Sequence, residues 1–390
     1  MRELRLHPKA DTRVRLGHAW VFSNEVEIAI TPLATFTPGE LARVMDSRGQ
    51  PIGIAYVNPK SLICARILTS DSRASIDQAW IRRRLERALA LREGLFSAPY
   101  YRAVFGESDG LPGLVIDRFG DVLSVQINTA GALALREAIF GAIDEVFSPR
   151  GCLFRTPSSV AELEGIPTLS EAIGDVPDQV EIHEGDMRLV APLATGQKTG
   201  YFYDQRDNRA RIARYIHLGA KVLDLFSYVG SWSIAAARNK AGSVTAVDSS
   251  PLAIEYAKEN AQRNGVEIET HCGDAIEAMR ALGQEGRRFD VVILDPPALI
   301  KRRKSQHAGE AHYEQLHTDA LAVLREGGTL VTSSCSHHLP AERLARIALE
   351  AARTSGRRIQ ILERHAHAPD HPVHPAMPET EYLKTLFLRA

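Results

Sequence analysis

The 390-residue sequence lacks the features that mark membrane, secreted and zinc-binding proteins. No run of 18 or more apolar residues occurs, and the segment Met1 to Arg5 has no signal-peptide pattern. There are four cysteines, Cys64, Cys152, Cys272 and Cys335, and no C-x-x-C spacing. A zinc site and a disulfide framework both need more closely grouped cysteines. We therefore expect a cytoplasmic protein without a membrane segment or a metal.

The sequence also lacks an excess of charge of either sign, since its formal net charge is −1. Binding to a polyanion would therefore depend on local basic patches. Two are present: Arg82-Arg83-Arg84 with Arg87, and Lys301-Arg302-Arg303-Lys304. The first is typical of a solvated helix face. The second directly follows Asp295-Pro296-Pro297, so we expect Lys301, Arg302, Arg303 and Lys304 to contact RNA phosphates.

A chain of this length predicts two or three domains, and the sequence shows neither repeats nor low-complexity tracts. Residues 1–73 contain short β-rich runs separated by turn signals, which favours a small β-barrel or sandwich. Residues 74–190 predict an α+β domain, with a helix over 74–94, a hairpin over 113–127 turning at Phe119-Gly120-Asp121, a helix over 130–147 and a strand pair over 180–190. Residues 191–390 form the third predicted domain.

Strands and helices alternate through this third domain, which predicts an α/β fold with a doubly wound parallel sheet. The expected strands lie at 221–226, 243–248, 267–271, 290–294, 329–333 and 360–364. Ligands of such sheets bind at the edge formed by the carboxyl ends of the strands.

The first of these strands runs into a tight turn, Phe226-Ser227-Tyr228-Val229-Gly230, before a helix. A dinucleotide site would require G-x-G-x-x-G, but this turn has only Gly230. A cofactor with a pyrophosphate is therefore disfavoured, and S-adenosylmethionine is favoured over NAD.

Acidic residues follow three of the strands and complete the predicted cofactor site. Asp248 is placed to accept hydrogen bonds from ribose hydroxyls, and Asp274 to contact an adenine amino group. The alternative for Asp248 is that it caps the helix starting near Pro251, although Ser249 or Ser250 could cap that helix equally well.

Cys335 lies one strand beyond Asp295 in the predicted sheet order. If both strands are parallel, the thiol and the carboxylate emerge at the same edge. A small buried residue would be the ordinary interpretation of a single cysteine. The proximity to Asp295 favours a catalytic interpretation, in which the two groups attack and hold a pyrimidine ring.

With these residues in view, the chain resembles the type I family of large-subunit ribosomal RNA cytosine-C5 methyltransferases. The likeness extends over nearly the whole chain. The segments that carry it are Gly17–Glu25, Asn58–Ser61, Glu107–Leu114, Thr195–Arg209, His371–Val373 and Glu379–Lys384. The chain differs from the family pattern at Ser231, where a second glycine is common, and at Asp224, where Asn is frequent.

The resemblance implies a PUA domain, a small central domain and a C-terminal class I methyltransferase domain. It implies that S-adenosylmethionine binds in the third domain and that large-subunit ribosomal RNA is the partner. The implied cofactor residues are Phe226, Ser227, Tyr228, Gly230, Asp248, Ser249, Asp274 and Asp295, with Tyr203 and Gln205 toward the methionine end.

The resemblance also implies a mechanism, since carbon-5 of cytosine is a poor nucleophile. Cys335 would attack carbon-6 as a thiolate, and Asp295 would hydrogen-bond N3 and the exocyclic amine of the base. The target base would be single-stranded or flipped out of its stack.

Three alternatives remain at this point. A methyltransferase of the same fold acting on a guanine nitrogen would need no thiol. An RNA-binding assembly factor would have a vestigial cofactor pocket. A small-molecule methyltransferase would have little use for two N-terminal domains. The sequence leaves the target nucleotide and a homodimer open.

Overall fold

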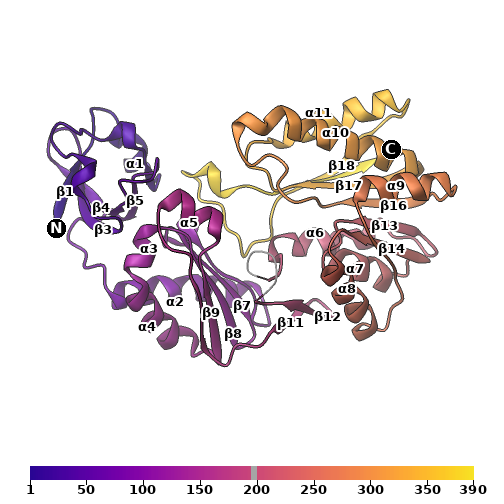
Figure 1. Ribbon diagram of the computed structural model, residues 1–390, viewed down its shortest axis with the longest axis horizontal. Helices are drawn as coiled ribbons and strands as arrows, with labels where there is room; N and C mark the ends of the chain where they lie inside the picture. The colour runs from indigo at the N-terminus through magenta and orange to yellow at the C-terminus, as the bar shows by residue number, and fades with distance from the viewer. Residues whose placement is uncertain (195–199) are drawn as a thin grey trace. The chain divides into compact units, whose positions relative to one another are not determined.

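The computed structural model describes residues 1–194 and 200–390, which form two compact units. The first unit comprises Met1–Val180, Pro192–Tyr203 and Pro369–Thr380. The second comprises Glu181–Ala191, Asp204–Ala368 and Glu381–Ala390. The amino-terminal sheets belong to the first unit and the large C-terminal sheet to the second (Figure 1).

The amino-terminal part of the first unit is built on a five-stranded sheet of order β1-β3-β4-β5-β2. Its elements are β1 (Arg2–Arg5), α1 (Asp11–Arg15), β2 (Trp20–Val21), β3 (Glu40–Met45), β4 (Pro51–Val57) and β5 (Ala65–Thr69). Leu4, Val44 and Val57 pack in its core and are fully buried. Leu6, which follows β1, pairs with Val26, which follows β2, in an isolated antiparallel bridge, so the segments beyond the two edge strands meet. The expected small β-rich fold at the amino terminus is therefore confirmed.

A second five-stranded sheet, of order β10-β9-β8-β7-β6, follows in the first unit. Its elements are α2 (Gln78–Leu95), β6 (Tyr100–Phe105), β7 (Leu114–Phe119), β8 (Val122–Ile127), α3 (Ala130–Ala134), α4 (Arg136–Phe147), β9 (Gly151–Arg155), α5 (Ser158–Glu164) and β10 (Ser170–Gly174). The predicted hairpin is confirmed, because β7 and β8 pair antiparallel from Leu114↔Ile127 to Phe119↔Val122. The predicted helix over 130–147 is interrupted between α3 and α4.

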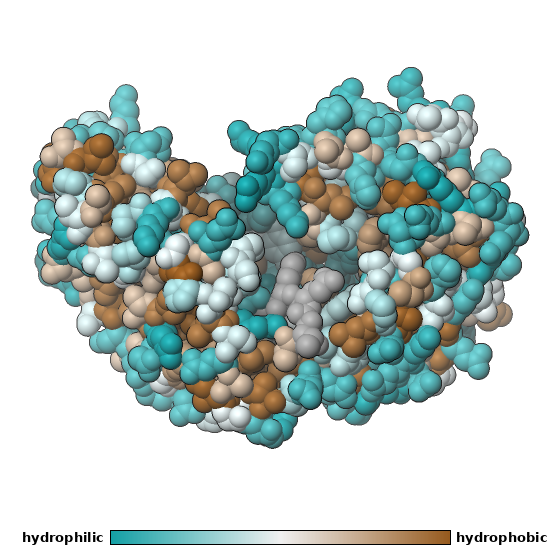
Figure 2. Space-filling model, viewed as in Figure 1, coloured by the Kyte–Doolittle hydropathy of each residue, from teal (hydrophilic) through white to brown (hydrophobic). Residues whose placement is uncertain are grey.

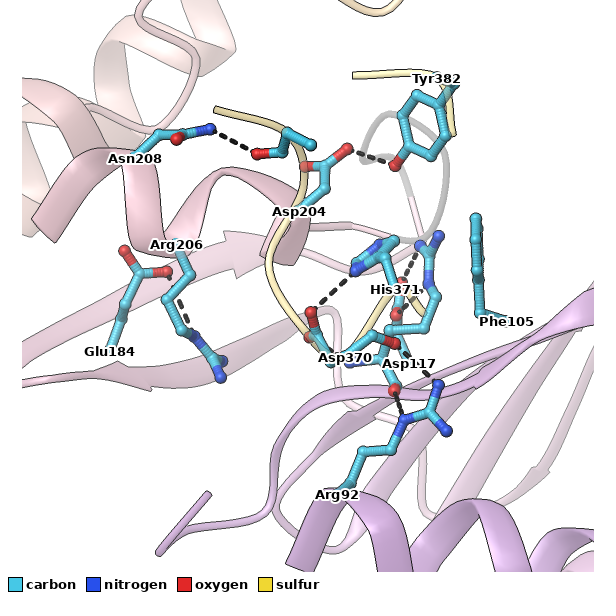
Figure 3. Close-up of polar contacts among 12 residues, drawn as sticks. Arg92, Phe105, Asp117, Glu184, Asp204, Arg206, Asn208, Asp370, His371 and Tyr382 are labelled. Carbon is cyan, nitrogen blue, oxygen red and sulfur yellow. Dashed lines mark hydrogen bonds and ion pairs between the residues drawn. The ribbon is translucent and has the colours of Figure 1, made fainter. Parts of the chain in front are cut away.

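A buried arginine ties the C-terminal segment Pro369–Thr380 into the first unit. Arg92 of α2 is fully buried and pairs with Asp109 at 2.7 Å. Its guanidinium also donates to the backbone oxygen of Asp370 at 2.8 Å, and Asp370 in turn contacts the ring of His371 (Figure 3). The His371–Val373 motif of the sequence therefore lies in the first unit, next to Asp370, which Arg92 contacts.

The second unit contains a two-stranded sheet, β11 (Gln179–Glu184) and β12 (Met187–Pro192), and a seven-stranded sheet of order β15-β14-β13-β16-β17-β19-β18. The seven strands are β13 (Lys221–Leu225), β14 (Ser243–Asp248), β15 (Glu269–Cys272), β16 (Phe289–Leu294), β17 (Leu324–Ser334), β18 (Gln360–His365) and β19 (Lys384–Arg389). Only β19 runs antiparallel to its neighbours among these strands. The doubly wound sheet is confirmed, and its topology is that of a class I methyltransferase.

Helices cover both faces of this sheet (Figure 1). They are α6 (Arg206–Arg211), α7 (Ser231–Arg238), α8 (Pro251–Arg263), α9 (Ala275–Gln284), α10 (Gln306–Val323) and α11 (Ala341–Thr354). Helices α9, α10 and α11 pack on one face over a core that includes Val292, Leu330 and Leu386, all about 1% exposed or less. The strands are apolar along their length because both faces are covered.

The surface of each unit is mainly hydrophilic in the view of Figure 2, with small separate hydrophobic patches. Within residues 1–194 and 200–390, no helix combines the length and the apolar character needed to cross a membrane.

Candidate functional site

The turn between β13 and α7 has an unusual backbone. Phe226, Tyr228 and Gly230 have φ values of 64°, 48° and 82°. The left-handed region is costly for residues other than glycine, and such residues cluster at ligand sites. Position 230 favours glycine for its positive φ and also for its packing, because a Cβ there would lie 3.0 Å from Cβ of Ala257 in α8. The turn thus holds its backbone close to the carboxyl end of the sheet.

Asp248 at the end of β14 fixes this turn. Its Oδ2 accepts a hydrogen bond from the backbone N–H of Tyr228 at 2.9 Å, and its Oδ1 accepts one from Ser250 at 2.9 Å. Ser250 is the residue that caps α8, through its hydroxyl and the N–H of Ala253. The capping alternative for Asp248 is therefore replaced by a role in shaping the turn, and Ser249 lies between the two.

Asp274 follows the next strand and caps α9. Both of its bonds, from the N–H groups of Ile276 and Glu277, end on Oδ1. The side chain is exposed at the same edge of the sheet as Asp248, because β15 pairs with β14 in parallel register. Asp274 thus combines a structural bond with an accessible carboxylate.

Asp295 follows β16 and is held between two donors. The side-chain amide of Gln205 donates to Oδ1 at 2.9 Å, and the indole N–H of Trp232 donates to Oδ2 at 3.1 Å. Asn208 donates to the amide oxygen of Gln205 at 2.7 Å, which orients the nitrogen toward Asp295. Burial, together with the charge of Asp204, raises the pKa of Asp295 to about 6 despite these bonds.

Asp224 in β13 adds a fourth acid beneath the turn. It is fully buried, and burial raises its pKa to about 7, with contributions from Asp295 and Asp248. Its Oδ2 accepts a hydrogen bond from Ser233 at 2.6 Å, while its Oδ1 has no partner among the described residues. The buried hydroxyl of Ser227 likewise lacks a partner within the described chain.

These groups fit S-adenosylmethionine, which carries a sulfonium and an ammonium. A cation bound here would relieve the repulsion among Asp224, Asp248 and Asp295. The unpartnered atoms of Asp224 and Ser227 are buried polar groups that are costly to leave unsatisfied. A metal is the other ligand that acids attract, but no cluster of metal-binding side chains occurs in the described residues.

Cys335 lies at the same edge, directly after β17. Strands β16 and β17 are parallel with Leu294 opposite Thr332, so the residues that follow each strand emerge together. Both Cys335 and Asp295 act electrostatically on the hydroxyl of Tyr313, which donates to Ser334 at 2.8 Å. The expectation that the thiol and the carboxylate share one edge is met, and the thiol is partly exposed.

The remaining predicted residues are Tyr203 and the run Lys301–Lys304. Tyr203 is fully buried in the first unit, where its hydroxyl donates to the backbone oxygen of Arg118 at 2.9 Å. The run Lys301–Lys304 is exposed before α10, and none of its four side chains has an ion pair with a described residue. Residues 195–199, part of the segment most specific to the resemblance, lie outside the described residues.

Sequence reasoning missed Trp232, Asn208 and the role of Lys384. Trp232 could have been found from its place in the first turn of the helix after Gly230. Asn208 in α6 donates to Gln205, which precedes that helix, but Asp295, the partner of Gln205, is 90 residues away, so no local signal identifies the contact. Lys384 begins β19, a strand that the sequence analysis did not assign.

Two family models match the chain. A PUA-like domain matches residues 4–70, and a methyltransferase domain matches residues 216–367. The second match contains the turn, Asp248, Asp274, Asp295 and Cys335.

Relatives match over nearly the whole chain. A protein from Shewanella amazonensis named ribosomal RNA large subunit methyltransferase I is 35% identical over 99% of this chain and 98% of its own length. One of the same name from Erwinia tasmaniensis is 36% identical over 94% of each chain.

Solved structures share the fold over the full length. A chain from Streptococcus mutans described as a SAM-dependent methyltransferase matches with a TM-score of 0.84, 18% identity and 100% of both chains covered. A methyltransferase solved with S-adenosylhomocysteine matches with a TM-score of 0.86 and 19% identity over the same extent. These structures support the class I methyltransferase fold with its N-terminal PUA-like domain.

Proposed function

The chain belongs to the ribosomal RNA large subunit methyltransferase I family, and we propose that it forms 5-methylcytosine in that RNA through a covalent bond between Cys335 and the base. Membership of this family makes the chain an S-adenosylmethionine-dependent methyltransferase of large-subunit ribosomal RNA. What we propose beyond family membership is the target base and the covalent step.

The observation that carries the proposal is the meeting of Cys335 and Asp295 at the edge of the sheet that also bears Asp248. Purine-nitrogen transfer needs a hydrogen-bonding acid but no thiol. A partly exposed cysteine at the same sheet edge as an acid with a raised pKa is the pairing that attack on a pyrimidine calls for.

The cofactor would be held by the turn 226–230, by Asp248 at the ribose and by Asp274 near the adenine, with Ser249 and Gln205 beside them. When bound, S-adenosylmethionine supplies an electrophilic methyl group. The unpartnered atoms of Ser227 and Asp224 would face its polar end.

Cys335 and Asp295 would then activate the base. The thiolate forms a bond to carbon-6, and the electrons of the carbon-5–carbon-6 double bond shift so that carbon-5 becomes nucleophilic. Asp295 with a pKa of about 6 is roughly one-tenth protonated at pH 7, and the protonated form can donate to N3 of the base. After methylation a base removes the carbon-5 proton, and the carbon–sulfur bond breaks to return the thiolate.

The exposed run Lys301–Lys304 would lie against RNA phosphates near the target, as a set of cations with no ion-pair partner in the described chain. The PUA-like domain over residues 4–70 would add RNA contacts.

The test is to identify the product. Large-subunit ribosomal RNA from cells lacking the gene is incubated with purified protein and labelled cofactor, then digested and analysed as nucleosides by mass spectrometry. We expect 5-methylcytidine from the wild type and from Cys272→Ala, in which the other exposed thiol is removed, and none from Cys335→Ala. Labelled methylguanosine with activity retained in Cys335→Ala would instead establish the purine-nitrogen alternative.

A further inference from the structure

The strand that carries Lys384 pairs with the strand that precedes Cys335. Strands β17 and β19 run antiparallel, and Lys384 lies opposite Ser334. Cys335 is the next residue after Ser334. Lys384 is therefore fixed by backbone pairing beside the cysteine, although Lys384 and Ser336 are 48 residues apart in the sequence.

The ammonium of Lys384 is bonded to the residue that follows Cys335. Its Nζ donates to the backbone oxygen of Ser336 and to that of Tyr382, each at 2.7 Å. An ammonium has three hydrogens, so two are used by these carbonyls and one is left for a further acceptor. Tyr382 is itself anchored, because its hydroxyl donates to Asp204 (Figure 3).

We propose that Lys384 is a positioning residue that holds the sulfur of Cys335 as a thiolate for attack on the base. This inference rests on the proposed function and deepens it. The two carbonyl bonds keep the ammonium next to the cysteine while its charge offsets the charge on sulfur. The thiol proton leaves to solvent, and the sulfur keeps the electron pair that later forms the bond to carbon-6.

Other titratable groups surround the pair. Tyr313 of α10 interacts electrostatically with Cys335 and also with Asp295, which follows β16. Glu381, which precedes β19, interacts electrostatically with Lys384. His337 and His338 follow Cys335 in its own loop, and the ring of His337 lies 5.9 Å from that of Tyr382. Lys384 is the cation among these groups whose nitrogen is fixed to the residue next to Cys335.

The charge of Lys384 sets the pH range of the effect. Burial lowers its pKa to about 8, while the charges of Cys335 and Glu381 oppose that shift. Below pH 8 the ammonium is charged and favours the thiolate. Above pH 8 it loses its proton, and the advantage over a neutral side chain disappears.

The test measures alkylation of Cys335 by iodoacetamide from pH 5 to pH 10, with peptide mapping by mass spectrometry. Wild type is compared with Lys384→Met, Lys384→Arg and the control Lys221→Met, which changes an exposed lysine at the start of β13. Cys272, exposed in the same protein, serves as the internal reference thiol.

We expect Lys384→Met to slow alkylation of Cys335 at pH 7 by about tenfold, since a nearby opposite charge shifts a pKa by one unit or more. The two profiles should converge by pH 10. Lys384→Arg, whose charge persists, should match the wild type at pH 7 and exceed it near pH 9. Lys221→Met and the reference thiol should show no change.

Superimposable Cys335 profiles for wild type and Lys384→Met would overturn the inference. A Lys384→Arg variant whose Cys335 reacts no faster than that of the wild type at pH 9 would also overturn it. This second comparison remains informative if Lys384→Met does not fold. Alkylation requires neither RNA nor cofactor. A failed proposed function would therefore be detected separately, as methyl transfer by Cys335→Ala.

Discussion

The indole N–H of Trp232 donates to Oδ2 of Asp295 across 3.1 Å, from the first turn of α7 to the end of β16. This bond favours the carboxylate, while burial favours the protonated acid. In the proposed mechanism, this balance sets how much protonated Asp295 is present at neutral pH to donate to the target base.

Replacing Trp232 with Phe should therefore raise the pKa of Asp295 above about 6. A hydrogen bond to a charged group contributes about 1.5–3 kcal/mol, which corresponds to an upward shift of roughly one to two units. Carboxyl carbon NMR titration of Asp295, assigned with Asp295→Asn, measures the shift. An Asp295 titration identical in the two proteins would show that the indole does not control this acid.

Asp248→Ala should weaken S-adenosylmethionine binding by roughly 1.5–3 kcal/mol, the value of one or two charge-assisted hydrogen bonds. Isothermal calorimetry measures the affinity. Ser250→Ala is the matched control, because it removes the cap of α8 and should lower stability with little change in affinity. The assignment of Asp248 to the ribose fails if folded Asp248→Ala binds the cofactor as tightly as the wild type.

Asp224→Asn should stabilise the protein at high pH. The folded-state pKa of Asp224 is raised to about 7, above its ordinary value of 3.8. The protein therefore loses stability as the pH rises from about 4 to 7, because the folded state must then hold a buried anion. The loss approaches about 4 kcal/mol as an upper bound, and Asn does not incur it.

Thermal unfolding at pH 5 and pH 8 checks this expectation for Asp224. The gain in unfolding temperature of Asp224→Asn over wild type should be larger at pH 8. An equal gain at both values would mean that the carboxyl group does not titrate in this range. Saturating cofactor should reduce the pH 8 difference, since a bound cation offsets the anion.

Changing Lys301, Arg302, Arg303 and Lys304 to Gln should weaken RNA binding and leave cofactor affinity unchanged. For each phosphate that the protein no longer neutralises, the salt slope of binding should fall by about one unit. Filter binding at several salt concentrations measures the slope. The control changes Lys221, Lys240 and Lys258, exposed in the same unit, to Gln. A salt slope as steep as that of the wild type would reduce the run to a solvated loop.

The sequence was most informative where the relevant physics is local. The strands at 221–226, 243–248 and 290–294 are short, mainly apolar runs, and each lies within a residue or so of the observed bounds. The second ends in Asp248, and Asp295 follows the third. Parallel pairing then brings Asp248, Asp295 and Cys335 to one edge without further information. The single glycine was a sufficient signal for the turn, because position 230 requires both a positive φ and the absence of a side chain.

The rest depends on contacts between distant residues. Strand β19 inserts between β17 and β18 although it is last in the chain, and its lysine reaches the backbone next to Cys335 only through that pairing. The two donors that hold Asp295 come from α7 and from the turn before α6. The three-domain division and the site assignments remain predictions.

The most direct test of the covalent mechanism uses large-subunit ribosomal RNA carrying 5-fluorocytosine. Fluorine blocks the proton removal that releases the enzyme, so an attacking thiolate stays attached to carbon-6. The account predicts a protein–RNA adduct that forms only with cofactor present, survives denaturation and maps to Cys335 by peptide mass spectrometry. No adduct from wild-type protein that methylates the unmodified RNA, or an adduct on another residue, would contradict it.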